Sequence, residues 1–225
     1  MTNQKGTTMF ENDFFIDTET TGTFTAPIVY DFGGDFVISE NEINDVIYEV
    51  FYLMPELMEQ AHFSDKIPSY KEDIWESKRI VEEFFTLREK IRKMCYDGKI
   101  KRIFAHNASF DVRALNNTCK ALSNGNIKYF FPYNVEICDT LKMARAILGK
   151  DEQYIEYCKK NNYMTNHAKP RPRMTAEIIY RYITNDENFE EAHTGLADVK
   201  IEKQIYEYLY NKNPEADPIL YHAKA

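Results

Sequence analysis

The sequence lacks any long apolar run. No stretch approaches the roughly 18 consecutive apolar residues of a membrane helix, and the first residues do not join a cationic segment to an apolar one, as a secretory signal does. We therefore expect no association with a membrane. The expected location is the cytoplasm, or the host cytoplasm if a virus encodes the protein.

Closely spaced cysteines are also absent. The four cysteines form neither a C-x-x-C pair nor the dense pattern of a disulfide-rich domain. We expect reduced and mostly buried thiols at Cys95, Cys119, Cys138 and Cys158. Such dispersed thiols provide no site for a soft metal ion.

The chain has no excess of basic residues. It contains 28 Lys and Arg residues against 36 Asp and Glu residues, which gives a formal net charge of −8. This balance argues against a protein that coats nucleic acid through counterion release. A phosphate-bearing substrate would then need local positive charge, and two divalent ions held by carboxylates would offset half of the net charge.

Internal repeats, low-complexity tracts and Gly/Ser linkers are missing as well. Hydrophobic residues make up 44% of the sequence and charged residues 28%, as in ordinary globular proteins. A length of 225 residues suits one domain with a full hydrophobic core. We predict a single domain over residues 1–225, with its core at about 12–210 and a short tail at each end.

The first half of the chain has the pattern of strands followed by a helix. Short runs of β-branched and aromatic residues predict strands at 14–17, 28–38 and 45–54, with a turn at 39–44. The short connections between them indicate an antiparallel meander. Apolar residues at helical spacing predict a helix over 76–96, which ends before Gly98.

Strands and helices then alternate along the chain. Strands are expected at 101–106 and 134–139, each followed by a helix, at 108–122 and 140–148. Helical patterns continue at 151–162, 175–184 and 195–210, and residues 167–173 are expected to form an extended loop. This order predicts an α/β fold with a mixed central sheet.

Two acids stand at the end of the first expected strand. Residues two apart in a strand point to the same face, so Asp17 and Glu19 would project together. Adjacent carboxylates repel unless a cation lies between them, and a divalent metal is the usual partner. The pair also has an ordinary alternative, because D-x-E is common at solvated strand ends.

Asp111 comes early in the helix that follows the strand at 101–106. Its carboxylate could merely offset the positive end of the helix dipole, which is worth about 0.3–1 kcal/mol. If this strand and the first strand lie in one sheet, their ends can adjoin at one edge, where α/β proteins tend to hold their sites. His106 and Asn107 would then line the same crevice, or serve only in the turn.

His193 stands five residues before Asp198. Within an ideal helix, positions five apart are separated by roughly 140° around the axis. Gly195 allows His193 to lie on the loop that enters the helix and Asp198 in its first turns, so that both face one pocket. Alternatively, His193 and Thr194 merely cap the helix.

Taken together, these segments resemble the DnaQ-like 3′-to-5′ exonucleases, the DEDDh branch of the ribonuclease H-like superfamily. The resemblance rests on IDTETTG around Asp17 and Glu19, AHNASFD ending at Asp111, and HTGLADVKIE with His193 and Asp198. These segments occur in the family's order, and ICDTL at 137–141 resembles a further landmark. The chain departs from the family in a longer segment at 55–75 and in the stretch 149–174. The resemblance implies a ribonuclease H-like three-layer fold.

The resemblance also implies a role for each motif residue. Asp17, Glu19, Asp111 and Asp198 would hold two divalent ions, Mg²⁺ or Mn²⁺, and His193 would be the general base. Two ions about 3.5–4 Å apart supply a hydroxide nucleophile and stabilise the attacking and leaving oxygens, and hard carboxylate oxygens suit these ions. Without metal, we expect the four carboxylates to raise the pKa of His193 above its usual value of about 6.5.

Candidate substrate contacts come from two sources. The family's positions just after the first acid implicate Thr18 and Thr20, together with Asn107. Phe110 could stack on a base or belong to the core. The proline-spaced segment at 167–173 could follow a phosphate backbone or be a solvated loop. Its basic residues are Lys169, Arg171 and Arg173.

The expected activity is metal-dependent hydrolysis of single-stranded DNA from the 3′ end, with release of nucleoside monophosphates, in proofreading, replication or repair. RNA 3′-end trimming by the same chemistry is the nearest alternative. IDTET also resembles the D-x-D motif of aspartate-phosphorylating phosphatases, but Glu19 replaces its second Asp and no companion Lys motif is evident. A non-catalytic module associated with a DNA polymerase is the remaining alternative, against which all four acids and the histidine speak.

Overall fold

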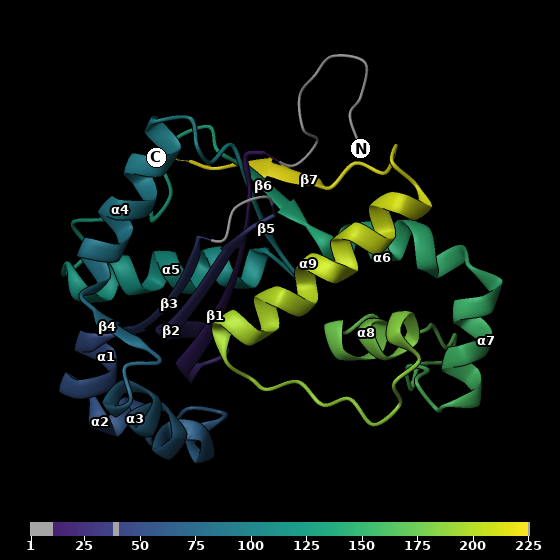
Figure 1. The fold of residues 1–225 in the computed structure, drawn as a ribbon, viewed down its shortest axis with the longest axis horizontal. Helices are drawn as coiled ribbons and strands as arrows, with labels where there is room; N and C mark the ends of the chain where they lie inside the picture. Colours follow the sequence, from purple (N-terminus) through teal and green to yellow (C-terminus); the bar gives the residue numbers. More distant parts are fainter. Residues whose placement is uncertain (1–10, 38–40, 225) are drawn as a thin grey trace.

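A mixed β-sheet forms the centre of the computed structural model, which describes residues 11–37 and 41–224 (Figure 1). Within these residues the sheet has seven strands in the order β4-β3-β2-β1-β5-β6-β7. The strands are β1 (Asp13–Thr23), β2 (Ala26–Phe36), β3 (Glu42–Ile47), β4 (Ile80–Glu82), β5 (Arg102–Ala105), β6 (Glu136–Asp139) and β7 (Ile219–His222). β1, β2 and β3 form the expected antiparallel meander, and β5 and β6 continue the sheet in parallel. The α/β fold with a mixed sheet is thereby confirmed.

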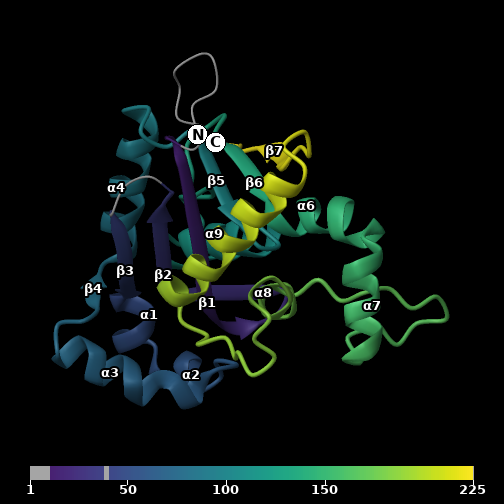
Figure 2. The same cartoon turned by 45° about the vertical axis from the view of Figure 1, so that its right-hand side comes forward.

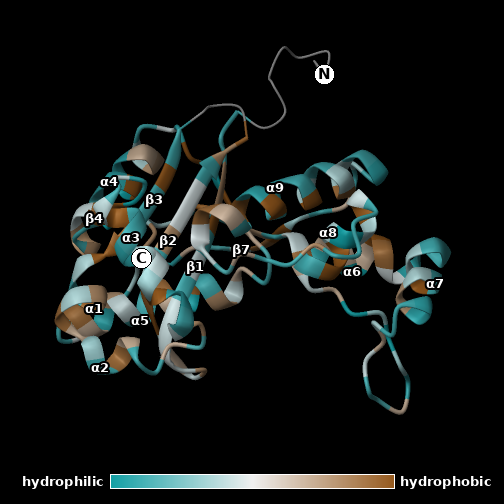
Figure 3. Cartoon of the chain, turned by 60° about the horizontal axis from the view of Figure 1, so that its bottom comes forward, coloured by the Kyte–Doolittle hydropathy of each residue, from teal (hydrophilic) through white to brown (hydrophobic). Residues whose placement is uncertain are grey.

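Helices cover both faces of the sheet. They are α1 (Tyr48–Leu53), α2 (Pro55–Met58), α3 (Ile67–Trp75), α4 (Phe84–Tyr96), α5 (Ser109–Leu122), α6 (Thr140–Ile147), α7 (Glu152–Lys160), α8 (Ala176–Thr184) and α9 (Gly195–Lys212). Figure 2 shows α9 crossing the sheet on the side where α8 lies. Both hydrophilic and hydrophobic residues occur along α9, as expected for a helix with one face on a sheet (Figure 3). No helix in the described part of the chain combines the length and the apolarity that a membrane span requires.

The alternation of β1 assigns its side chains to two separate cores. Phe14 and Ile16 belong to the core beneath α4 and α5, whereas Phe15 belongs to the core beneath α9. Because side chains two apart in a strand share a face, Asp17 and Glu19 continue the Phe15 face. The strand therefore directs both acids toward α9.

Two segments of the first half were assigned wrongly from the sequence. The strand expected at 45–54 ends at Ile47, and residues 48–53 form α1, which buries Val50 and Phe51. A short apolar run fits a buried strand and a helix equally well, so the periodicity of residues 48–53 does not distinguish the two structures. The helix expected at 76–96 begins only at Phe84, because Ser77 has a φ of 59° and Ile80–Glu82 pairs with β3.

The first expected strand, at 14–17, is present but continues to Thr23. The remaining expected elements are confirmed to within a few residues, and β7 was not foreseen. β7 pairs antiparallel with β6 at the edge of the sheet. The loop expected at 167–173 folds back on itself, with Met164 paired to Pro172. Residue 38 of the second expected strand, the start of the expected turn at 39–44 and most of the expected N-terminal tail lie outside the described residues. The four cysteines are unpaired, and all but Cys95 are buried.

Two glycines let α9 contact β2 directly. A Cβ atom on Gly33 would lie 2.0 Å from the carbonyl carbon of Gly195, and one on Gly195 would lie 2.5 Å from the Gly33 nitrogen. In the register of the sheet, Gly33 is opposite Asp17 and Asp31 is opposite Glu19. The start of α9 is therefore held beside the two acids of β1.

We predict that Gly195→Ala lowers the free energy of unfolding by about 1–3 kcal/mol or more, because the added methyl group meets backbone that cannot move aside. Urea denaturation measures this difference. Gly149→Ala is the matched control, since its Cβ would lie 3.9 Å from the Met174 methyl carbon, an ordinary contact. Equal effects of the two substitutions would contradict the close approach of α9 and β2.

Asp45 on β3 carries a fully buried carboxylate. Neither of its oxygens has a hydrogen-bond partner among the described residues, and the Lys90 ammonium lies 3.9 Å away. Burial raises the pKa of Asp45 to about 6, although Lys90 acts in the opposite direction. Since the folded state binds this proton more tightly than the unfolded state, the fold loses stability as the pH rises through about 6.

Asp45→Asn is therefore expected to stabilise the fold more at pH 8, where Asp45 is charged, than at pH 4. The shift from 3.8 to about 6 corresponds to a change of at most about 3 kcal/mol. Chemical denaturation of both proteins from pH 8 to pH 4 measures it. If the free energies of unfolding of the variant and the wild type differ by the same amount at every pH, ionisation of Asp45 does not destabilise the fold.

Candidate active site

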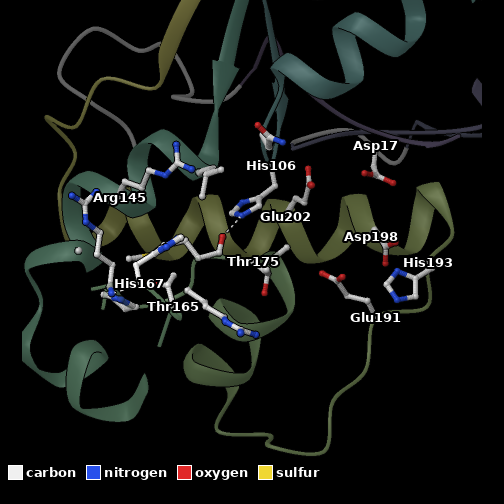
Figure 4. A pocket seen from close by; sticks show the side chains of 18 of the residues that line it. Asp17, His106, Arg145, Thr165, His167, Thr175, Glu191, His193, Asp198 and Glu202 are labelled. Carbon is white, nitrogen blue, oxygen red and sulfur yellow. Dashed lines mark hydrogen bonds between the residues drawn. The ribbon is translucent and has the colours of Figure 1, made fainter. Parts of the chain in front are cut away.

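A pocket of about 1370 Å³ opens beside β1, the start of α9 and the loop before α8 (Figure 4). One part of its wall is acidic and the opposite part is basic, and Figure 4 shows the acids around α9 and the basic side chains beyond His106. The acidic lining residues are Asp17, Glu19, Glu191, Asp198 and Glu202. The basic lining residues are Arg145, Lys150, Lys169, Arg171 and Arg173, with His167 beside them.

Three side chains of the acidic part converge on one point. One ligand atom each from Glu19, His193 and Asp198 lies within 4.8 Å of the others. Asp17 lines the same pocket, whereas Asp111 does not line it and is buried behind Thr18, whose hydroxyl donates to Asp111 Oδ1 at 2.8 Å. The fold thus brings the four motif acids into one region and places three of them at the pocket surface.

Of the four motif acids, Glu19, Asp111 and Asp198 are buried and Asp17 is half-buried. None of the four motif acids forms an ion pair with Lys or Arg among the residues the structure describes. Burial is the main cause that raises the pKa of Glu19 to about 8 and that of Asp198 to about 7. The charges of neighbouring carboxylates act in the same direction on both groups. Burial, followed by Asp111, raises the pKa of Asp17 well above its usual value.

The donor set fits divalent cations. Asp198 Oδ1 is buried and has no hydrogen-bond partner among the described residues. Hard carboxylate oxygens are the ligands that Mg²⁺ and Mn²⁺ prefer. A cation between these groups would also remove the repulsion that burial leaves unscreened. Glu19 and Asp198, with Asp17 beside them, are therefore the residues that could hold a divalent metal.

His193 lies on the loop before α9, as the sequence predicted, and its φ of 53° turns the chain sharply. Its ring stacks on Phe63 with centroids 3.9 Å apart and planes 12° from parallel. The alternative that His193 and Thr194 only cap the helix finds no support, because Thr194 makes no side-chain cap hydrogen bond.

The expected direction of the His193 pKa shift was wrong. Burial, and next the charge of Lys66, lowers the pKa of His193 below its ordinary value. The neighbouring carboxyl groups have raised pKa values themselves, so they carry little negative charge in the range where the imidazole titrates. The ring is therefore neutral at neutral pH without help from a metal ion.

Asp31 anchors the turn that carries His193. Its carboxylate accepts from Arg79 Nη1 at 2.8 Å, from the Tyr70 hydroxyl at 2.9 Å and from the Gly195 N–H at 3.1 Å. Tyr70 also donates to the His193 carbonyl at 3.4 Å. Sequence reasoning missed this buried network, because its members come from four separate segments and form no motif.

His106 and Asn107 line the pocket but also hold its frame together. His106 bonds to the Thr140 hydroxyl at 2.9 Å and donates from Nε2 to the Met174 carbonyl at 2.6 Å. The Asn107 N–H donates to Asp139 Oδ1 at 3.0 Å. These bonds join the ends of β5 and β6 to the segment before α8.

The other predicted contact residues separate into two groups. Thr18 and the three basic residues at 169, 171 and 173 line the pocket. Thr20 and Phe110 are not among its lining residues, and the Phe110 ring lies 6.1 Å from that of Phe24. Arg145, Lys150, Glu191 and Glu202 were not foreseen. Glu202 could have been, since it follows Asp198 by four residues, about one helical turn.

No protein-family model matches the sequence, and no curated protein matches it. Among solved structures, the chain is similar to exonuclease X in complex with 5′-overhanging duplex DNA. The TM-score is 0.44 at 15% sequence identity, and the alignment covers 92% of this chain and 96% of that chain. At this level of similarity, the function of this chain has to be inferred from its own residues.

We predict that saturating Mn²⁺ raises the melting temperature. A ligand that binds only the folded state stabilises it by about 2.7 kcal/mol at a hundredfold excess over Kd. Asp17→Asn should lose much of this gain and yet be at least as stable as the wild type in EDTA, because it removes a carboxyl group whose ionised form burial and the neighbouring carboxylates disfavour. Glu190→Gln, at an exposed acid, is the control. A wild-type melting temperature that Mn²⁺ leaves unchanged would contradict the metal site.

Proposed function

We propose that this chain is a metal-dependent 3′-to-5′ exonuclease of the DnaQ-like DEDDh type, which hydrolyses single-stranded DNA and releases nucleoside monophosphates. The observation that carries this proposal is the convergence of Glu19, Asp198 and His193 beside Asp17, at the acidic end of a pocket whose opposite wall is basic. The polarity and the DNA substrate rest on the resemblance of the three motifs to that family.

The site would hold two divalent cations, Mg²⁺ or Mn²⁺. When bound, they supply stabilisation of the charge that develops on the attacking and leaving oxygens of the phosphodiester. Glu19 and Asp198 would hold them together with Asp17, while Asp111 adds negative charge from behind Thr18. Carboxylates suit this task because a bound cation removes the repulsion between neighbouring carboxylates that have no cationic partner.

His193 is the general base in this proposal. Its burial keeps the pKa below the ordinary value, so the imidazole is neutral and able to accept a proton at neutral pH. The stacked Phe63 ring and the turn anchored by Asp31 hold the imidazole toward Glu19 and Asp198. An imidazole nitrogen would accept the proton of the attacking water, and the protonated ring would later return it to solvent.

The basic wall would bind the phosphates upstream of the scissile bond. Residues 163–173 fold back into a hairpin-like loop, with the Arg173 N–H donating to the Tyr163 carbonyl and the Thr165 N–H donating to the Arg171 carbonyl, each at 2.8 Å. This loop presents its cations to the pocket, so an extended strand could enter along it and end at the acids.

Matched DNA and RNA oligonucleotides, labelled at either end, test the function with Mg²⁺, Mn²⁺ or EDTA. A 5′-labelled single strand should give a descending ladder, and a 3′-labelled strand should release its label at once as mononucleotide. Preference for the RNA substrate would make the chain an exoribonuclease. Degradation that persists in excess EDTA would remove the metal-dependent mechanism, and no degradation under any condition would favour a non-catalytic binding module.

His193→Ala should lower kcat by about 10²–10⁴-fold with little change in KM, because it removes positioned proton transfer and leaves the carboxylates intact. Steady-state kinetics on a single-stranded oligonucleotide give both constants. His106→Ala is the comparison, since His106 lies in the same pocket and is engaged in hydrogen bonds through both ring nitrogens. Retained turnover in His193→Ala would show that the base is assigned wrongly.

Combined Lys169→Ala, Arg171→Ala and Arg173→Ala should raise KM and flatten its dependence on salt, because fewer counterions are released on binding. Measurements of KM between low and high salt give the slope. The matched control removes three exposed lysines that do not line the pocket, by Lys93→Ala, Lys99→Ala and Lys120→Ala. If both triple variants behave alike, the loop is an ordinary solvated surface.

A further inference from the structure

Glu202 is the last residue of the segment HTGLADVKIE, and the family resemblance assigns it no role. Its side chain is a further acid at the acidic end of the pocket. It lies on α9 four residues after Asp198, so both side chains lie on neighbouring turns of one helix face. The side chain lines the pocket although the residue is only 4% exposed. A carboxylate with so little access to water needs a compensating partner.

The described residues do not supply that partner in full. Glu202 Oε2 has no hydrogen-bond partner among them, and no Lys or Arg of the described chain pairs with this carboxylate. Burial, and next the charge of Asp111, raise the pKa of Glu202 well above its ordinary value, and a backbone hydrogen bond from His106 acts in the opposite direction. Glu202 thus lines the pocket and has one buried oxygen without a hydrogen-bond partner among the described residues.

The neighbours of Glu202 place it beside Asp17. Burial, and next the charges of Asp111, Glu202, Glu19 and Asp198, raise the pKa of Asp17. For Glu202 the carboxylates that act in the same direction are Asp111, Asp198 and Glu191. The compact group described above consists of Glu19, His193 and Asp198 and does not include Glu202. In Figure 4, Asp198 and His193 lie together, and the carboxylate of Glu202 is directed to the side of α9 on which Asp17 lies.

We propose that Glu202 is a ligand of one of the divalent cations, which it holds together with Asp17. The other cation would lie between Glu19 and Asp198. This assignment rests on the proposed metal-dependent function. A bound cation would be the missing partner of the buried Glu202 Oε2. The cation beside Asp17 would then have two carboxylate ligands, Asp17 and Glu202.

Titration of the metal-free protein with Mn²⁺, in the absence of nucleic acid, tests the proposal. Free Mn²⁺ is measured by electron paramagnetic resonance, which reports stoichiometry and Kd without any turnover. The wild type should bind two ions. Glu202→Gln should bind one of them at least about tenfold more weakly, since even the loss of an outer-sphere partner costs about 10–100-fold in affinity.

Two further variants make the result decisive. Glu202→Asp keeps the charge on a shorter side chain and should recover part of the lost affinity, and it replaces the Gln variant if that one does not fold. Glu207→Gln removes an exposed carboxylate from the same helix and should bind like the wild type.

The outcomes separate this proposal from the proposed function. If the wild type binds two ions and Glu202→Gln binds them with unchanged Kd, Glu202 is a protonated structural acid and only this proposal fails. If the wild type binds no Mn²⁺, the metal-dependent function and the role of Glu202 fail together.

Discussion

The contact between two glycines determines where the chemistry of this protein can lie. α9 can approach β2 so closely because neither Gly33 nor Gly195 carries a side chain. Asp31, two residues before Gly33 on β2, then accepts a hydrogen bond from the Gly195 N–H and fixes the start of the helix. Since Gly33 and Asp31 face Asp17 and Glu19 across the sheet, the same contact brings Asp198 to the acids of β1. The site is in this sense a consequence of backbone packing.

Charge explains the rest of the arrangement. A chain with a net charge of −8 gathers carboxylates without cationic partners at one end of this pocket and places cationic side chains at the other. Burial, and next the charges of neighbouring carboxylates, raise the pKa values of Asp17 and Glu19, so protonation or a bound cation would stabilise these groups. The pKa of His193 is lowered instead, by burial and next by the charge of Lys66. Phe63 stacks on its ring, and the neighbouring carboxyl groups are themselves weakly ionised. Acidic and basic side chains are thereby separated along one pocket.

The sequence was informative wherever the chemistry is local. Spacing alone placed His193 before a helix and Asp198 within its first turn, and strand alternation set Asp17 and Glu19 on one face. It failed where a contact joins distant segments. Arg79, expected to lie in a helix, and Tyr70, from the segment before it, both reach Asp31. Ser77 has a left-handed backbone conformation that no sequence pattern indicated, and the expected helix begins only at Phe84. Short apolar runs such as residues 48–53 fit two structures until tertiary packing chooses one.

Anomalous diffraction from crystals grown with Mn²⁺ is the most direct test of the central claim, that the acids around α9 form a divalent cation site. The account predicts two anomalous difference peaks in the pocket, one in contact with Glu19 and Asp198 and the other in contact with Asp17. Their separation should be about 3.5–4 Å, as in two-metal phosphodiester hydrolysis. Well-ordered density for all these side chains with no peak between them, at a Mn²⁺ concentration that fills surface sites, would contradict it.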